Sequence, residues 1–349
     1  MSESIAGTAT PPASFFSGSR GLLMRLRVLM FGHFMAIGAI APILNLYLQR
    51  ELHFAGWQAG VVMGMLPFGM ILGCLINASL TDRLIRAEHL YALLKVVASL
   101  AALGLCFVER FPSFALVFGI YALSFSPSGA VKEAVCLHHL PSGRRNDFGT
   151  VRVFATFGWI LAGWLVPGIF YSFSGLPVHP NLFQWAFLLA SLAAMMNAVV
   201  VLSLPRREIA HTKATRTGTL FPPGMWAIFR LRPILLLILS TFAIGFLDRY
   251  FYFAMWPHLE TLGMAPSRVL PLMTVAQMLE IPALFALGAL LRRWGFRRVM
   301  TVGVTLQLIR FSLLAFGGTL TTACLGLVLH GVAFGFFFVP AMMCFDRLC

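Results

Sequence analysis

The chain has 349 residues, of which 59% are hydrophobic and only 11% are charged, with a mean hydropathy of +0.86. A soluble globular domain carries about 25% charged residues, so this composition excludes a soluble protein and indicates an integral membrane protein. The formal net charge of +14 comes mostly from arginines between apolar runs, which favours a role in membrane topology over nucleic-acid binding.

Ten long apolar runs dominate the chain after a polar tail at residues 1–27, which has no apolar core of a cleavable signal peptide. A helix needs about 20 apolar residues to cross the hydrocarbon core, whereas barrel strands would be shorter and alternating. The sequence therefore predicts an all-α polytopic membrane protein with about ten transmembrane helices, at approximately 28–48, 57–78, 91–108, 112–132, 150–172, 182–204, 234–256, 268–291, 298–316 and 321–344.

The basic residues between these runs predict the orientation. With the amino terminus inside, 18 Lys and Arg fall in cytoplasmic segments and three fall outside, Arg50, Arg110 and Arg268. Positive charge accumulates on the cytoplasmic side of membrane proteins. We therefore expect a multi-pass protein of the cell (inner or plasma) membrane with both termini in the cytoplasm.

Motifs for enzyme chemistry are missing from the sequence. It contains no GxSxG, HExxH or GxxxxGK[ST] stretch, and its six cysteines are scattered without a CxxC pair or histidine spacing. We therefore expect no enzyme activity, no metal site and no cofactor. A gradient would then supply the energy, which favours secondary transport, while the few and diverse buried polar groups argue against a channel.

A 28-residue polar linker at 205–232 divides the chain into a six-helix bundle at 28–204 and a four-helix bundle at 233–349. The second helix of each half ends in an Arg-rich turn, "NASLTDRLIR" at 77–86 and "GALLRRWGFRR" at 288–298, as expected of an internal repeat. In the first turn, Asp82 and Arg83 are expected to lock the cytoplasmic helix ends together, in a gating or structural role.

Several stretches resemble one family of transporters, namely "LPSGRRNDFGTVRVFATFGWILAGWL", "AQMLEIPALFALGALLRRWGFRRVM", "IRFSLLAFG" and "LHGVAFGFFFV". Together with the six-helix half, the linker and the Asp-Arg turn, they resemble the nucleoside:proton symporter family of the major facilitator superfamily. The resemblance runs from about residue 28 to the carboxyl terminus. It implies a helical bundle that carries a nucleoside-like small molecule with protons, by alternating access.

The chain departs from this family in length, because the implied fold has twelve helices and the sequence ends just after the tenth, at "CFDRLC". Either the gene is truncated, or a homo-oligomer or partner completes the carboxyl-terminal half. The alternatives to proton-coupled nucleoside transport are a non-transporting membrane protein, such as a sensor, scaffold or pseudogene product, and a carrier for another small organic solute.

Gln277 and Glu280 lie near the middle of an apolar run. An acidic residue at the centre of a spanning helix costs about 2.5–3.5 kcal/mol on insertion scales, so it usually faces a cavity or a partner. At a spacing of three the two side chains share a helix face. An amide beside a carboxylate suits a sugar hydroxyl or a base edge, and the resemblance places Gln and Glu in the binding cavity. The alternative is a polar pair that joins two helices.

Arg152, Thr156 and Trp159 form a second polar stripe, at the spacing i, i+4, i+7. The resemblance carries an arginine, a threonine and an aromatic ring to these positions as substrate contacts. A ring can stack on a nucleobase, and a guanidinium can donate to a base or ribose oxygen. The alternative for Arg152 is a side chain that extends to the cytoplasmic surface.

Asp248 and Arg249 lie deep in the seventh run. Consecutive helical residues point about 100° apart, so the two side chains cannot both face one cavity wall. The resemblance aligns polar substrate contacts of the family with Arg249 and Tyr252, and the alternative is a structural ion pair.

In the tenth run, His330 and Phe334 stand where the resemblance implies two aromatic substrate contacts. The next position, often an acid tied to proton coupling in the family, is Gly335 here. Glu280, Asp248 and His330 are therefore the predicted proton-coupling residues, and the sequence does not choose among them.

Overall fold

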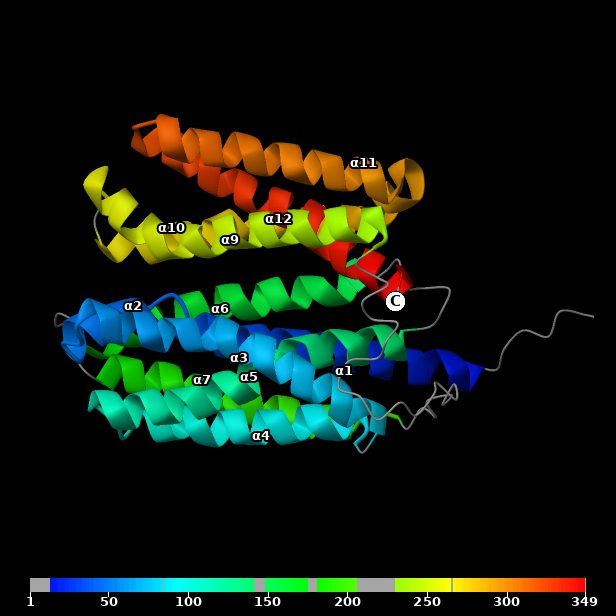
Figure 1. Cartoon of the computed structure of the whole chain (residues 1–349), viewed down its shortest axis with the longest axis horizontal. Coiled ribbons are helices and arrows are strands. Elements are labelled where there is room, and N and C mark those ends of the chain that lie inside the picture. The colour runs from blue at the N-terminus through cyan, green and yellow to red at the C-terminus, as the bar shows by residue number, and fades with distance from the viewer. Residues whose placement is uncertain are drawn as a thin grey trace, which may run out of the picture.

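The computed structural model of the chain is a bundle of long helices (Figure 1). It describes the backbone of residues 13–83, 85–140, 148–174, 181–205, 230–264 and 266–348. Within these residues, nine helical segments are long and apolar enough to cross a membrane.

The helices follow the apolar runs of the sequence closely, because each run is long enough to satisfy its backbone polar groups internally in lipid. The connections that lie wholly within the described residues are short. The helix bounds are α1 Ala13–Ile40, α2 Leu44–Leu46, the π-helix η1 Tyr47–Glu51, α3 Gly56–Arg83, α4 Ala87–Leu105, α5 Phe111–His139, α6 Phe148–Ser174, α7 Asn181–Leu202, α9 Arg232–Thr261, α10 Pro266–Met278, α11 Glu280–Phe316 and α12 Leu320–Leu348.

The segment Leu272–Phe316 accounts for two membrane passes, although it counts as one of the nine. Gly295 interrupts it with φ 77° and ψ 167°, a backbone conformation that glycine adopts far more readily than residues with a side chain. The chain reverses direction there, between the predicted runs 268–291 and 298–316. The described helices therefore make ten passes, which confirms the predicted all-α bundle of about ten helices.

The helices form two groups in space (Figure 1). In one group α1 packs on α6 and α7, α4 packs on α5 and α7, and α3 packs on α5. In the other, α12 packs on α10 and extensively on α11. The two groups meet through α6, which contacts both α10 and α11. On this seam the indole nitrogen of Trp164 donates a hydrogen bond of 3.0 Å to Thr274 Oγ1.

An apolar core joins the two groups at the end of the molecule where α1 begins and α12 ends. Leu29 of α1 and Val151 of α6 share this core with Leu287 of α11 and Met343 of α12. At the opposite end the buried apolar residues form two separate cores, one within each group, and Trp256 of α9 is a partly buried neighbour of both. The groups are thus held together most extensively at one end.

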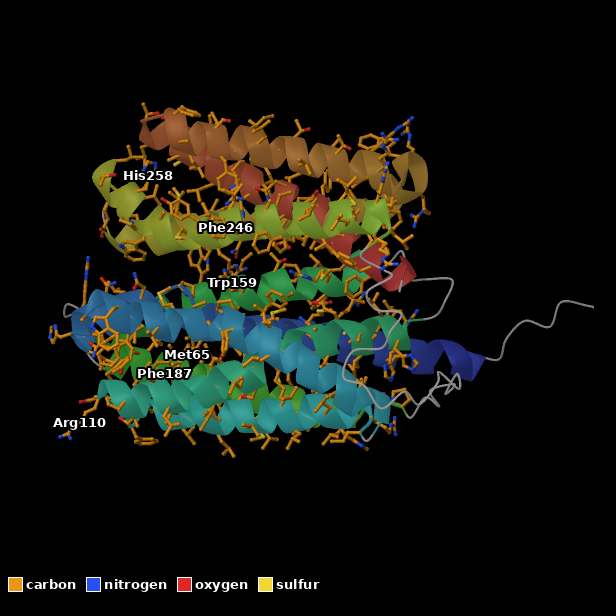
Figure 2. The ribbon with its side chains drawn as sticks, in the orientation of Figure 1. Met65, Arg110, Trp159, Phe187, Phe246 and His258 are labelled. Atoms are coloured by element: carbon orange, nitrogen blue, oxygen red, sulfur yellow. The ribbon has the colours of Figure 1, made fainter. Side chains whose placement is uncertain are left out.

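Large apolar side chains cover the outside of the helices, as expected of a lipid-facing surface. Phe246 on α9, labelled in Figure 2, is 65% exposed, and Phe68 on α3 is 60% exposed. Charged groups inside the bundle are few by comparison, so each buried one needs a physical explanation.

Candidate functional site

A break between α10 and α11 positions the two polar residues of the eighth apolar run. α10 ends at Met278 and α11 begins at Glu280. Pro282 follows closely and lacks a backbone N–H, so the Met278 carbonyl loses its helical hydrogen bond. The helix is disturbed at this turn, although Leu279 itself keeps helical φ and ψ angles of −74° and −15°, and Glu280 lies directly after it. Glu280 and Gln277 are both buried, at 6% exposure.

α12 packs directly against this break through Gly331. A Cβ atom at this position would lie 2.5 Å from the Glu280 backbone nitrogen and 2.8 Å from the Ala276 carbonyl oxygen. Only a residue without a side chain allows the two backbones to approach so closely. The break, and with it the position of Glu280, is therefore fixed by α12.

An ion pair across the seam joins the two groups of helices. Arg152 Nη1 of α6 lies 3.9 Å from Glu280 Oε1 of α11, and both residues are buried. Thr156, one turn further along α6, approaches the same carboxylate, although its hydroxyl does not meet the geometry of a hydrogen bond. The structure thus brings together three of the predicted substrate contacts, from two different groups of helices.

Several buried polar atoms of this cluster make no hydrogen bond within the described residues. They are Nε and Nη1 of Arg152, Oγ1 of Thr156 and Oε1 of Glu280. Buried polar atoms are nearly always satisfied in folded proteins, and a cluster of unsatisfied ones indicates a place for water or a polar solute. Donors and an acceptor are both present, as the hydroxyls and base edges of a nucleoside would require.

Aromatic rings flank Arg152 on two sides. Its guanidinium carbon lies 4.3 Å from the ring centre of Phe34 on α1 and 5.7 Å from that of Phe334 on α12. Trp159 on α6 is half-buried, and in Figure 2 it lies where the two groups face each other. Phe34 was not predicted from the sequence, because nothing in the first apolar run distinguishes it from other lipid- or core-facing rings.

A second buried cluster lies on α9, α11 and α12. Asp248 Oδ1 is 3.4 Å from Arg310 Nη1 and 3.6 Å from His330 Nδ1. Arg310 Nη1 also donates a hydrogen bond of 2.7 Å to Gln307 Oε1. The ring of Phe251 stacks on His330, with centroids 5.3 Å apart, and lies 4.2 Å from the Arg310 guanidinium carbon. Two predicted coupling residues, Asp248 and His330, are therefore in one cluster.

Arg310 had no evident role in the sequence, and the structure supplies one. It is completely buried, and Asp248 gives it a counter-ion from a helix 62 residues away in the chain. Phe334 lies between the two clusters, with its ring centre 6.0 Å from that of His330. Gly335, next along α12, is buried and faces α11, where a Cβ would lie 3.5 Å from Leu284 Cδ2.

The remaining predicted residues are placed less fully. Asp248 is buried and Arg249 is exposed, so the two adjacent side chains do face different ways. Tyr252 lies in α9, and Asp82 and Arg83 lie at the end of α3, but their side chains fall outside the described residues. Their predicted roles stay predictions.

Known proteins with similar sequences and folds are membrane transporters. A sequence model of the family described as "Nucleoside H+ symporter" matches residues 20–348. The chain is 27% identical over 336 residues to the xanthosine permease of Escherichia coli (strain K12), a match that covers 90% of this chain and 77% of the permease.

Solved structures agree with the sequence match. A crystal structure of a mutant of the nucleoside transporter NupG gives a TM-score of 0.72 at 19% identity, covering 94% of this chain and 83% of that one. The proton:xylose symporter XylE, described as a major facilitator superfamily protein, gives 0.62 at 16% identity and covers 95% of this chain and 81% of its own. These likenesses identify a major facilitator fold. The chain therefore belongs to the nucleoside H+ symporter family, and it is a membrane transporter, not an enzyme.

Proposed function

We propose that the chain carries a nucleoside, or a closely similar polar solute, together with protons, and that the solute binds at the Arg152–Glu280 pair. The observation that carries this proposal is the pair itself, because it joins the two groups of helices and leaves buried polar atoms without protein partners. A solute that completes these hydrogen bonds would be held between the two groups of helices. In alternating access, the two groups move relative to each other around such a site and so carry the solute across the membrane.

The surroundings of the pair suit the parts of a nucleoside. Glu280 accepts hydrogen bonds from ribose hydroxyls, and the Arg152 guanidinium donates to carbonyl or ring-nitrogen acceptors of the base. Trp159 and Phe334 offer ring faces on which a base can stack. Gln277 adds an amide from α10. We propose that Arg249, Tyr252 and His330 complete the site on the side of α9 and α12.

The asymmetric packing supports alternating access as the mechanism. The two groups share one apolar core at the end where α1 begins and α12 ends, and they have separate cores at the other end. The distribution of arginines supports placing the joined end in the cytoplasm, with both termini inside and the protein in the cell inner membrane. The structure then corresponds to a state closed toward the cytoplasm.

Proton coupling is proposed to involve Glu280, Asp248 and His330. Protonation of either acid removes the counter-ion of a buried arginine, which is costly unless another acceptor replaces it. A bound solute can supply that acceptor to Arg152, whereas Arg310 is enclosed. We therefore propose that Glu280 takes up and releases its proton while the solute is bound. A proton on His330 would strengthen its contact with Asp248.

The test is Glu280→Gln, which keeps the shape of the side chain and removes its charge. A hydrogen bond to a charged group contributes about 2 kcal/mol, so losing the one from the solute to the Glu280 carboxylate lowers the affinity roughly 30-fold. Uptake of labelled uridine and adenosine should fall accordingly in cells without other nucleoside carriers, while the protein still reaches the membrane.

Glu260→Gln is the matched control, since Glu260 accepts a hydrogen bond of 2.9 Å from Trp256 and lies on α9 away from the pair. It should transport like the wild type. Normal uptake by Glu280→Gln would contradict the site, and a well-inserted wild type that moves no nucleoside would favour the non-transporting alternative.

A further inference from the structure

Lys95 differs from the other buried cations of the described chain. Lys132, Arg152 and Arg310 each have a carboxylate oxygen within 4.0 Å, at 3.1, 3.9 and 3.4 Å. Lys95 on α4 is completely buried, and its Nζ instead lies 2.9 Å from Nδ1 of His33 on α1. An amine and an imidazole form this hydrogen bond only if one of them offers a lone pair.

Two features stabilise a positive charge at this pair, and others oppose it. Lys95 Nζ lies 3.8 Å from the ring centre of Phe125 and 5.4 Å from that of Tyr91, and a desolvated cation over a ring gains about 2 kcal/mol. Burial of an uncompensated lysine in a membrane helix costs about 2.5–3.5 kcal/mol on insertion scales. The rings thus offset part of the cost of a positive charge at the pair.

Charged side chains near the pair come from several helices. Lys132 on α5 and Arg152 on α6 both lie against the ring of Phe34, which follows His33 on α1, and nearby like charges oppose a second positive charge. Glu133 on α5 is paired with Lys132. Glu88, near the start of α4, contacts Arg86 and His139. The neighbouring α7 contributes the uncharged Asn197, which is buried.

We propose that Lys95 and His33 form a proton-binding site that is emptied and refilled once in each transport cycle. This inference rests on the proposed proton-coupled transport and names a binding site for the proton in the opposite bundle from Glu280, Asp248 and His330. The pair holds one proton at most, because neighbouring cations oppose a second. Lys95 and His33 remain hydrogen-bonded to each other when the proton leaves. Protonation of Glu280 or Asp248, in contrast, removes the counter-ion of a buried arginine.

The proton transfer balances on these two side chains alone. A proton from water binds the lone pair on Nε2 of neutral His33 while its Nδ1–H is donated to the Lys95 amine. That hydrogen passes to Nζ, giving an ammonium and an imidazole with its proton on Nε2. Release is the reverse. Gly129 of α5 leaves room beside the ring, since a Cβ there would lie 3.6 Å from His33 Nε2.

α1 connects this site to the proposed solute site. Phe34 follows His33 on α1, and its ring centre lies 4.3 Å from the Arg152 guanidinium carbon and 4.4 Å from Lys132 Nζ. α1 also packs closely on α6, where a Cβ at Gly158 would clash with the Phe31 carbonyl of α1. A change of charge at the Lys95–His33 pair therefore acts on the helix that borders Arg152.

The experiment separates solute exchange from proton-driven accumulation in liposomes that contain the purified protein. Labelled uridine exchanging against internal uridine needs no net proton movement, whereas accumulation under an imposed acid-outside gradient does. Proton entry is followed with an internal pH dye. The variants are Lys95→Gln, Lys95→Arg, which keeps a cation that does not deprotonate, and His33→Asn.

We expect all three variants to exchange uridine at close to the wild-type rate. Accumulation and the dye signal should fall by roughly a hundredfold, the scale of losing a positioned proton-transfer group. Ser99→Ala is the matched control. Ser99 lies one turn along α4 and is buried, with its hydroxyl 2.9 Å from the Ser191 carbonyl oxygen, yet it carries no proton of the pair. It should keep both activities.

Wild-type accumulation by Lys95→Arg or His33→Asn would overturn the proposal. Loss of exchange together with accumulation in all folded variants would also overturn it, because the pair would then be structural or part of the solute site. A wild-type protein that neither exchanges nor accumulates uridine would contradict the proposed function. The proposed proton-binding site depends on that function and would be contradicted as well.

Discussion

At the scale of single residues, the buried charges are arranged so that most have a partner on another helix. Arg152 meets Glu280, and Arg310 meets Asp248. Removing one member of such a pair leaves an uncompensated charge, which is more costly than never having had the pair. The identity of each partner therefore decides which substitutions the protein tolerates.

Asp248→Asn should destabilise the protein by about 3–5 kcal/mol, since it leaves Arg310 buried without a counter-ion. The measurement is thermal unfolding of the purified protein in detergent. The double variant Asp248→Asn with Arg310→Gln should recover much of the loss, because it removes the orphaned charge as well. A single variant as stable as the wild type would show that the pair contributes nothing to the fold.

Some side-chain positions could be predicted from the sequence and others could not. The angle between consecutive helical residues predicted that Asp248 and Arg249 face different ways, and the structure has one buried and the other exposed. The partner of Arg310 could not be predicted, because it lies 62 residues away on a helix whose rotation the sequence does not specify. Lys95 and His33 also lie in apolar runs, at 91–108 and 28–48, where an ionisable side chain is itself a signal, but their pairing depends on the rotation of two helices and could not be predicted.

At the scale of elements, the break between α10 and α11 is the feature that shapes the solute site. Apolar length predicted one run at 268–291, and the structure keeps Leu272–Phe316 as one apolar segment with a local disturbance at Leu279. Pro282 gives a local reason, but the close approach of α12 through Gly331 is a tertiary contact that no local pattern reveals.

Gly331→Ala should therefore move α12 away from the break. Its Cβ would lie 2.5 Å from the Glu280 nitrogen, so the thermal stability and uridine uptake should both fall. Gly335→Ala, one turn along the same helix, places its Cβ at an ordinary 3.5 Å from Leu284 Cδ2 and serves as the control for stability.

Both alanine substitutions change the helix propensity by the same amount, about 1 kcal/mol in favour of alanine. The difference in unfolding temperature between the two variants thus isolates the clash. Equal stability of the two would mean that α12 does not pack against the break as closely as described.

At the scale of the whole molecule, hydropathy was sufficient to predict the ten passes, because lipid leaves few alternatives to a spanning helix. Which helices meet across the two groups was not predictable in detail, since helix rotation and crossing are set by packing rather than by apolar length. The result is a molecule joined by a common apolar core at one end and by separate cores at the other.

We propose that these ten passes enclose a solute site used for proton-driven nucleoside transport. The most direct measurement is uptake of radiolabelled uridine and adenosine in cells that lack their own nucleoside carriers, with and without a protonophore. Uptake that the protonophore abolishes is the predicted result. A correctly inserted protein that takes up neither nucleoside, or one whose accumulation the protonophore leaves unchanged, would contradict the claim.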